Sequence, residues 1–391
     1  MPVVSPTLSN LTGGGSDGWE VFMRARQMIA AGTPVLELTI GEHDIRTDPS
    51  ILAAMDKAAR GGHTGYAMVP GIVKLREAVA RRVTERTGVP TSVENVMITP
   101  GGQAALFASH LATCPHGSKA LYIDPYYATY PGTLRGVGAV AAPVPAHAEN
   151  GFQPRASDID AAATGASSLL INSPNNPTGV IYTRETLEDI AEVCKKRDLW
   201  LISDEVYDTQ IWQGEHISPR SLPDMAERTL VIGSMSKSHA MTGSRVGWIV
   251  GPANIIAHIS NLATHTTYGV AGFIQDAALF ALEQGTALED KVGAPFARRR
   301  ELTVAILNKQ NHIRMIPADG AMYVMLDIRE TGLSGEDFAN QLLDTHHIAV
   351  MPGESFGAAA AGHIRVAMTI ADDAYVEALQ TLCDFAAELC E

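Results

Sequence analysis

Three short segments carry side chains that could take part in covalent and acid–base chemistry. Lys237 lies among serine, methionine and alanine with no acidic neighbour in sequence, and a lysine whose pKa is lowered by burial can bond covalently to a carbonyl carbon. Asp204 follows an apolar run, where an aspartate can serve as a charge partner or cap a helix. Asn176 lies in a turn-rich stretch at 171–179. Taken alone, each segment has an ordinary structural explanation.

These segments follow short apolar runs that alternate with helical patterns, such as those at 72–87 and 183–197. The alternation predicts an α/β domain with a mostly parallel sheet covered by helices on both faces. Functional side chains should then gather where loops leave the carboxyl ends of the strands. The expected strands are 95–99, 120–124, 168–172, 199–203, 229–233 and 246–251.

The pattern changes after about residue 280. A long helical stretch at 287–310 leads to shorter strand-like and helical segments, which predict a second, smaller α+β domain. A ligand is expected between the two domains. The predicted division is a flexible N-terminal arm at 1–16, a segment at 17–48 that packs with the small domain, a large cofactor-binding domain at 49–286 and the small domain at 287–391.

The composition excludes several classes of protein. A formal net charge of −14 would repel a phosphate backbone and anionic lipid alike, so neither nucleic acid nor a membrane surface is an expected partner. The first residues have no secretory pattern, and no apolar run is long enough to span a membrane. The positions of the cysteines suggest neither a disulfide framework nor a zinc site, so a reducing cytoplasm is the expected location. They are Cys114, Cys194, Cys383 and Cys390.

The chemical segments form an ordered set along the chain: Asn-Pro-Thr-Gly at 176–179, Asp204 with Tyr207, Ser234 with Lys237, and Arg245. This set resembles that of the fold type I, pyridoxal-phosphate-dependent aminotransferases of class I/II, from about Asp17 to the C-terminus. The resemblance implies a large domain with a mostly parallel sheet of the seven-stranded type, a smaller α+β domain and pyridoxal 5'-phosphate as the cofactor. No metal is implied.

The resemblance implies a role for each residue near the cofactor ring. Lys237 would hold the cofactor covalently and later move the substrate α-proton, and Asp204 would keep the ring nitrogen protonated. Tyr207 and Asn176 would donate hydrogen bonds to the ring hydroxyl group. Tyr127 would stack on the ring face. Lys237, Asp204 and Tyr207 are therefore the predicted catalytic residues.

A second group of residues is expected at the cofactor phosphate. Gly101, Gly102 and Gln103 follow a strand and open a helix, where backbone N–H groups can bind a phosphate. Ser234 and Arg245 resemble the hydroxyl and guanidinium ligands of the family.

The resemblance also implies a homodimer and a substrate site. Tyr66 matches a tyrosine that reaches the phosphate in the neighbouring subunit, which makes the active sites shared. Arg365 resembles the bidentate clamp for the substrate α-carboxylate, with Gly41 and Asn176 beside it. The small domain could then close over the bound amino acid.

The amino-acid sequences of several segments are similar to those of arginine:pyruvate transaminases. Aspartate-type enzymes are the alternative subfamily. Substrate preference does not transfer directly, because His43 stands where many relatives have proline and Gln103 where lysine is frequent. A cationic substrate side chain would need a carboxylate near the entrance. Asp17, Glu20 and Glu42 are the candidates.

The expected activity is a ping-pong transfer of an amino group from an L-amino acid to a 2-oxo acid. A carbon–sulfur β-lyase on the same fold would share every cofactor residue. A cofactor-binding regulator would need a DNA-binding segment, for which this acidic chain leaves no room before Asp17.

Overall fold

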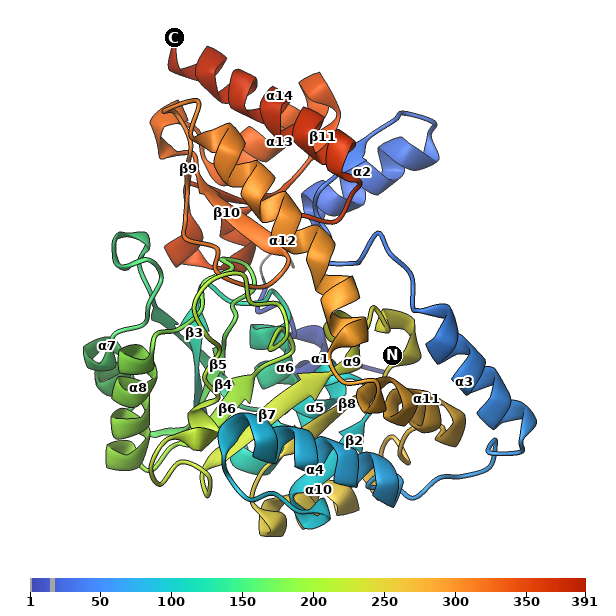
Figure 1. The fold of residues 1–391 in the computed structure, drawn as a ribbon. Helices are drawn as coiled ribbons and strands as arrows, with labels where there is room; N and C mark the ends of the chain where they lie inside the picture. The colour runs from blue at the N-terminus through green and yellow to red at the C-terminus, as the bar shows by residue number, and fades with distance from the viewer. Residues whose placement is uncertain (1, 15–17) are drawn as a thin grey trace.

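A seven-stranded sheet forms the centre of the larger domain in the computed structural model, which describes residues 2–14 and 18–391 (Figure 1). The strand order is β2-β8-β7-β6-β5-β3-β4. β8 runs antiparallel to both of its neighbours, and the other neighbouring pairs are parallel. The strands are β2 (Val96–Thr99), β3 (Lys119–Asp124), β4 (Val140–Pro145), β5 (Ala166–Asn172), β6 (Trp200–Asp204), β7 (Thr229–Ser234) and β8 (Gly247–Val250).

Six of these strands match the runs predicted from the sequence, whereas β4 was missed. β4 is an edge strand with mostly exposed or half-buried residues, and it contains Pro143 and Pro145. Proline is tolerated at a sheet edge because one side of the strand needs no ladder hydrogen bonds. The two prolines interrupt its run of valine and alanine, so the segment was not recognised as a strand.

Helices cover both faces of this sheet. Leu169 and Ile171 of β5 point into a core shared with α7 (Ala156–Ala162) and α8 (Arg184–Arg197). Leu170 points into the opposite core, which α5, α6 and α10 complete. A third core lies between the β2 side of the sheet and α3, α4 and α11. These helices are α3 (Pro49–Arg60), α4 (Val73–Thr87), α5 (Gly102–Thr113), α6 (Tyr130–Gly136), α10 (Ala253–Thr264) and α11 (Gly272–Glu283).

The smaller domain is built on a four-stranded antiparallel sheet in the order β12-β13-β10-β9. Three helices of this domain cover the sheet, and its core also includes Tyr375 and Phe296. Its elements are β9 (Arg314–Met315), β10 (Tyr323–Asp327), β11 (Ile348–Ala349), β12 (Met351–Pro352), β13 (His363–Ala367), α12 (Ala287–Leu307), α13 (Gly335–His346) and α14 (Asp372–Cys390).

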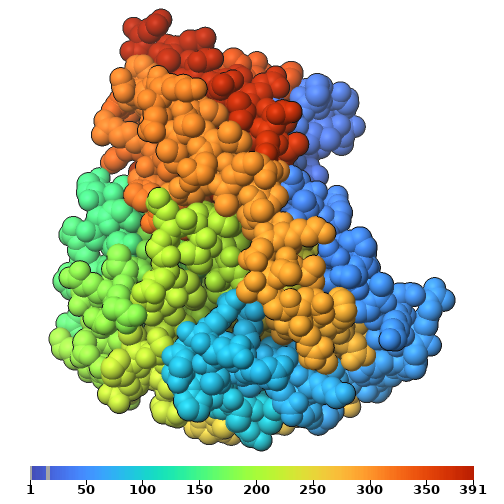
Figure 2. Space-filling model, in the orientation of Figure 1, coloured from blue at the N-terminus to red at the C-terminus, as the bar shows by residue number. Residues whose placement is uncertain are grey.

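Residues near the N-terminus join this smaller domain. β1 (Leu36–Glu37) pairs in parallel with β11, and Val21 and Ala25 of α2 (Glu20–Ala30) are buried in the same core. α2 contacts α13, β11 and β12, and in Figure 2 the blue N-terminal segment continues from there down the side of the larger domain. Before it, α1 (Pro6–Ser9) lies near α6, and Asp17 falls outside the described residues.

The long helix α12 passes from the larger domain into the smaller one (Figure 1). Its buried Arg299 donates hydrogen bonds to both carboxylate oxygens of Asp44, at 3.1 and 2.6 Å. The same guanidinium donates to Asp372 at 2.8 Å and to the main-chain oxygen of Met368 at 2.9 Å. One side chain thus joins the loop after β1 to the segment after β13.

Among the described residues, no helix is both long and apolar enough to cross a lipid bilayer.

Replacing Phe338 by alanine should lower the free energy of unfolding by about 3 to 5 kcal/mol, because it leaves a cavity in the core of the smaller domain. Phe338 is fully buried, and its ring centroid lies 5.1 Å from that of Phe385. Urea unfolding followed by circular dichroism would measure the change. Met23→Ala on α2, where the side chain is 53% exposed, should cost less than about 0.5 kcal/mol. Equal losses for the two variants would contradict this account of the core.

Candidate active site

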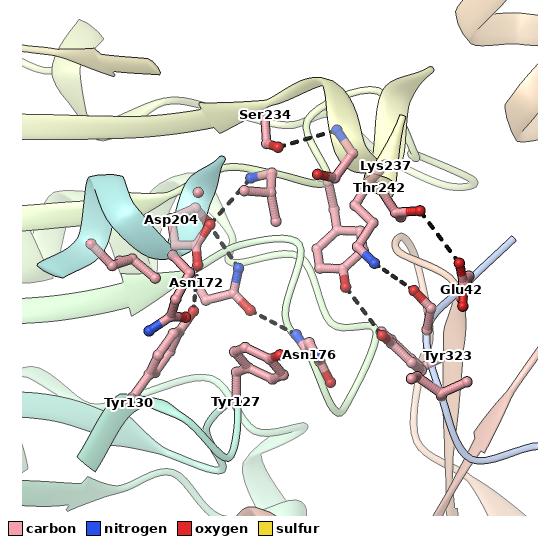
Figure 3. Close-up of a pocket in the computed structure, with 18 of the residues that line it drawn as sticks. Glu42, Tyr127, Tyr130, Asn172, Asn176, Asp204, Ser234, Lys237, Thr242 and Tyr323 are labelled. Atoms are coloured by element: carbon pink, nitrogen blue, oxygen red, sulfur yellow. Dashed lines mark hydrogen bonds between the residues drawn. The ribbon is translucent and has the colours of Figure 1, made fainter. Parts of the chain in front are cut away.

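A cavity of about 430 Å³ opens at the carboxyl ends of the central strands, between the two domains (Figure 3). Asn172, Asp204 and Ser234 line it, and they are the last residues of the adjacent strands β5, β6 and β7. The opposite wall comes from β10 and β13 of the smaller domain and from residues 40–42. The parallel strands therefore deliver three polar side chains to one place, as the sequence predicted.

The cavity brings together most of the predicted site residues: Gly41, Gly102, Gln103, Tyr127, Asn176, Asp204, Tyr207, Ser234, Lys237, Arg245 and Arg365. Gly101 lies directly behind this lining, and a Cβ there would collide with the Arg245 guanidinium. Tyr66 is not in the lining and is 91% exposed. Of the carboxylates considered for a cationic substrate, Glu42 lines the cavity and Glu20 lines a separate hollow beside α6.

Asp204 forms the floor of the cavity. Tyr130 donates a hydrogen bond of 2.6 Å to its carboxylate, and the backbone N–H of Val206 donates a second at 3.3 Å. Asn172 holds the main chain there by donating to the Asp204 carbonyl oxygen at 2.8 Å. Burial raises the pKa of Asp204 to about 6, against the effect of the Tyr130 hydrogen bond, which lowers it. The carboxyl group is thus poised to pair with a positively charged ligand atom.

Lys237 faces this floor from the short helix α9 (Met235–Ser238). Its amine donates a hydrogen bond to the Gly41 carbonyl oxygen, and no carboxylate of the described residues lies within ion-pair distance. Burial lowers the pKa of Lys237 and outweighs the opposing influence of Tyr323 and Glu42. An amine with a lowered pKa is more often unprotonated, and so is available as a nucleophile or a base.

Arg365 forms the opposite wall and is only 1% exposed. Its guanidinium donates to the side-chain oxygen of Asn176 at 2.8 Å and to the Thr39 carbonyl oxygen. It also lies 4.3 Å from the ring centroids of Tyr323 and Phe356. Its Nε has no hydrogen-bond partner among the described residues, and none of their carboxylates pairs with it. A buried cation held in this way is prepared for an anionic ligand.

The far end of the cavity combines a helix N-terminus with a hydroxyl group and a cation. Gly102 is the first residue of α5, and Gly101 before it has a φ of +83°, which glycine adopts without strain. Ser234 is held by a hydrogen bond from the backbone N–H of Ser236 at 3.1 Å. Arg245 donates to the Thr242 carbonyl oxygen at 2.7 Å. This arrangement can bind a phosphate group.

Three contributors were missed by reasoning from the sequence: Tyr130, Asn172 and Tyr323. No pattern in the sequence singled out Tyr130, and only the fold shows that its hydroxyl reaches Asp204. Tyr323 lies in a predicted strand, and its hydroxyl is 3.2 Å from that of Tyr207. Asn172 lies in the turn-rich stretch at 171–179, and its side-chain oxygen accepts from the Asn176 backbone N–H at 2.8 Å.

The cavity combines a buried lysine of lowered pKa with a polar end that can bind a phosphate group, which is the set of groups that a phosphate-bearing aldehyde requires. The sequence model of the family "Aminotransferase class I and II" matches residues 33–382. An arginine–pyruvate transaminase of Pseudomonas aeruginosa is 41% identical over 380 residues, which are 97% of each chain. An aspartate aminotransferase of Thermotoga maritima is 31% identical over 94% of this chain and 95% of its own length.

Solved structures agree with these relatives. The aspartate aminotransferase of Thermus thermophilus, determined with maleate, superposes with a TM-score of 0.91 at 31% identity and covers 98% of this chain and 100% of its own. The chain belongs to the class I and II aminotransferases, and it is a pyridoxal-phosphate-dependent transaminase of fold type I. The relatives are named transaminases, and the alternative of a carbon–sulfur lyase finds no support among them.

The residues present fit pyridoxal phosphate. Of the cations that line the cavity, Lys237, Arg245 and Arg365, none forms an ion pair with a described residue. The ligand must therefore supply the anionic groups. The buried Asp204 carboxyl group can in turn pair with a protonated ring nitrogen.

Replacing Tyr130 by phenylalanine should raise the pKa of Asp204 above its value of about 6, because the hydrogen bond that stabilises the charged form is lost. In the cofactor-free chain the Asp204 carboxyl group would then keep its proton to a higher pH. Infrared difference spectroscopy across a pH titration would locate the midpoint. Tyr127→Phe is the matched control, since no hydrogen bond joins the Tyr127 hydroxyl to Asp204. A midpoint that is unchanged in Tyr130→Phe would show that this hydrogen bond does not tune Asp204.

Proposed function

We propose that this transaminase takes its amino group from a basic L-amino acid, arginine first, and passes it to a 2-oxo acid such as pyruvate in a ping-pong cycle. The main support for transamination is that Lys237, Asp204 and Arg365 face one another in a single cavity. The arginine–pyruvate transaminase shares 41% of its residues with this chain, against 31% for the Thermotoga maritima aspartate aminotransferase.

The charges around the cavity also favour a basic substrate. Once Lys237, Arg245 and Arg365 are engaged by cofactor and substrate α-carboxylate, the lining described here offers no further cation for a second substrate carboxylate. It does offer Glu42, whose carboxylate accepts a 3.4 Å hydrogen bond from Thr242. An acidic donor would meet this carboxylate unfavourably.

We assign the catalytic roles to residues at the floor of the cavity. Bound pyridoxal phosphate supplies an electron sink that makes the α-proton of the amino acid acidic. Lys237 would hold the cofactor before substrate binds, and its released amine would then take the α-proton and return it. Asp204 would keep the ring nitrogen protonated, and the Tyr207 hydroxyl would donate to the ring oxygen. Tyr127 would cover the ring face.

The remaining groups would bind and orient. Gly101, Gly102 and Gln103 at the start of α5 would hold the phosphate together with Ser234 and Arg245. At the other end Arg365 would clamp the substrate α-carboxylate.

Two further groups would complete the carboxylate site. The Asn176 side-chain oxygen already accepts from Arg365, so its NH₂ group remains free to donate to the ligand. Gly41 would bring its backbone to the same carboxylate.

We propose further that two copies of the chain form a homodimer with Tyr66 reaching the phosphate of the partner's cofactor. Tyr66 and Tyr268 form an exposed pair with ring centroids 5.1 Å apart, 91% and 52% exposed. An exposed aromatic pair of this kind is typical of a surface that another subunit covers.

We propose, in addition, a division into domains and a cytoplasmic location. Of the domain division at residues 16, 48 and 286, the packing of the N-terminal segment with the smaller domain is supported by the core that Val21, Ala25 and Leu38 share with that domain, whereas the boundary at residue 16 lies outside the described residues. A cytoplasmic location is supported by the cysteines, all four of which are free thiols.

Supplying arginine without any 2-oxo acid should convert one equivalent of arginine per active site into its 2-oxo acid, with no ammonia released. Pyruvate added afterwards should yield alanine. Chromatography of the products and comparison with aspartate and alanine as donors would measure this.

Lys237→Ala should lower the rate by about 10²- to 10⁴-fold, whereas Lys196→Ala, on the surface of α8, should not. Free ammonia and pyruvate from a single donor, or faster turnover of aspartate, would contradict the proposal.

Replacing Tyr66 by phenylalanine should weaken cofactor binding about tenfold, because a hydrogen bond to a charged phosphate is lost across the dimer interface. Fluorescence titration of the cofactor-free protein would give the Kd. Tyr268→Phe removes a hydroxyl from the neighbouring ring and should leave the Kd unchanged. Light scattering should give twice the mass of one chain for both variants, and a monomeric wild type would overturn the assignment.

A further inference from the structure

We propose that His43 is a positioning residue for Lys237, whose main chain it fixes so that the amine stays in reach of the substrate α-carbon. The proposal rests on the proton-transfer role assigned to Lys237 above.

The contact between the two residues is direct. His43 is 4% exposed, and its Nε2 lies 2.9 Å from the main-chain oxygen of Lys237. Because a carbonyl oxygen can only accept, Nε2 carries the proton of this hydrogen bond. Gln210 donates to the same oxygen at a longer distance of 3.3 Å. His43 therefore makes the shorter of the two side-chain contacts that hold this carbonyl group.

The helix that carries Lys237 needs such support. α9 has four residues, and the carbonyl groups at the end of a helix have no partner within the helix. No backbone N–H of the described residues beyond α9 donates to the Lys237 carbonyl oxygen. Lys237 is the last residue but one of this single helical turn, and its carbonyl group is bound by side chains from elsewhere in the fold.

Residues 41–44 hold the lysine from two sides and are themselves anchored. The Gly41 carbonyl oxygen accepts from the Lys237 amine, while His43 binds the Lys237 main chain. The His43 ring packs edge-on against Phe296 of α12, with centroids 5.4 Å apart, and Asp44 is paired with Arg299 of the same helix. The imidazole is therefore fixed by packing and by its neighbour in sequence.

The charge state of His43 suits this role. Burial, followed by the nearby Lys237 charge, lowers the pKa of His43 to about 4, against the opposing effects of its hydrogen bond to Lys237 and the Asp44 charge. The ring therefore stays neutral at neutral pH, with its proton on Nε2. It can hold the lysine main chain without adding a positive charge beside the amine.

Three substitutions in the holoenzyme test the proposal. His43→Phe keeps an aromatic ring against Phe296 and removes the donor, whereas His43→Gln restores an N–H group at similar reach. His110→Phe is the matched control, because His110 is also fully buried, on α5, but neither ring nitrogen has a hydrogen-bond partner among the described residues. The readouts are the pH titration of the bound cofactor's visible absorbance and the single-turnover rate at saturating donor.

His43→Phe should slow the single turnover by about 10- to 100-fold and displace the midpoint of the absorbance titration, with the donor KM changed less than about threefold. His43→Gln should recover most of both, and His110→Phe should change neither. If His43→Phe does not fold, His43→Met replaces it as the variant without a donor.

If the variant without a donor has the same absorbance titration and single-turnover rate as the wild type, the proposal is wrong. It is also wrong if His43→Gln is as impaired as His43→Phe. The outcome is distinct from failure of the proposed function. Undiminished turnover in Lys237→Ala would remove the role of the lysine itself, whereas an inactive Lys237→Ala with a normal His43→Phe would remove only the role of His43.

Discussion

Arg365 is buried without a counter-ion, and much of the site serves to stabilise this buried cation. Moving a charge out of water costs several kcal/mol even after the protein relaxes, so about that much must be offset by other groups. The chain supplies the Thr39 carbonyl oxygen, the Asn176 side chain and two aromatic rings. These are dipoles and π faces, which stabilise a cation but leave its charge available. A carboxylate that enters the cavity completes the pairing, and the fold gains stability from the ligand by mass action.

On the other side of the cavity, the ends of the sheet strands position the polar side chains of the floor. Adjacent parallel strands end together, so Asn172, Asp204 and Ser234 reach the same layer directly from the strands. Hydrogen bonds then link the strand ends, since Asn172 binds both the Asp204 main chain and the turn that carries Asn176. The rigid floor and the substrate clamp are therefore joined through one asparagine turn.

Local pattern was sufficient to predict the buried strands of the central sheet, whereas most residues that line the cavity were predicted through the family that the ordered motifs resemble. It failed for β4, which is an exposed edge strand, and for Tyr130 and Tyr323, whose roles depend on contacts with residues far away in the sequence. Periodicity records which face of an element is buried but not which distant hydroxyl meets it. Tyr66 is a separate case, because its predicted partner belongs to a second chain, and its role stays a prediction.

The Arg299 contacts have a consequence for recombining this chain with its relatives. Asp44 comes from the N-terminal segment, whereas Arg299, Met368 and Asp372 come from the C-terminal third, and β1 and β11 pair across the same divide. A chimaera that exchanged only one of these regions would take one part of the ion cluster from this chain and the other part from a relative. The strand pair β1 and β11 would be divided in the same way. The two ends of the chain would therefore have to be exchanged together, although the whole larger domain separates them in sequence.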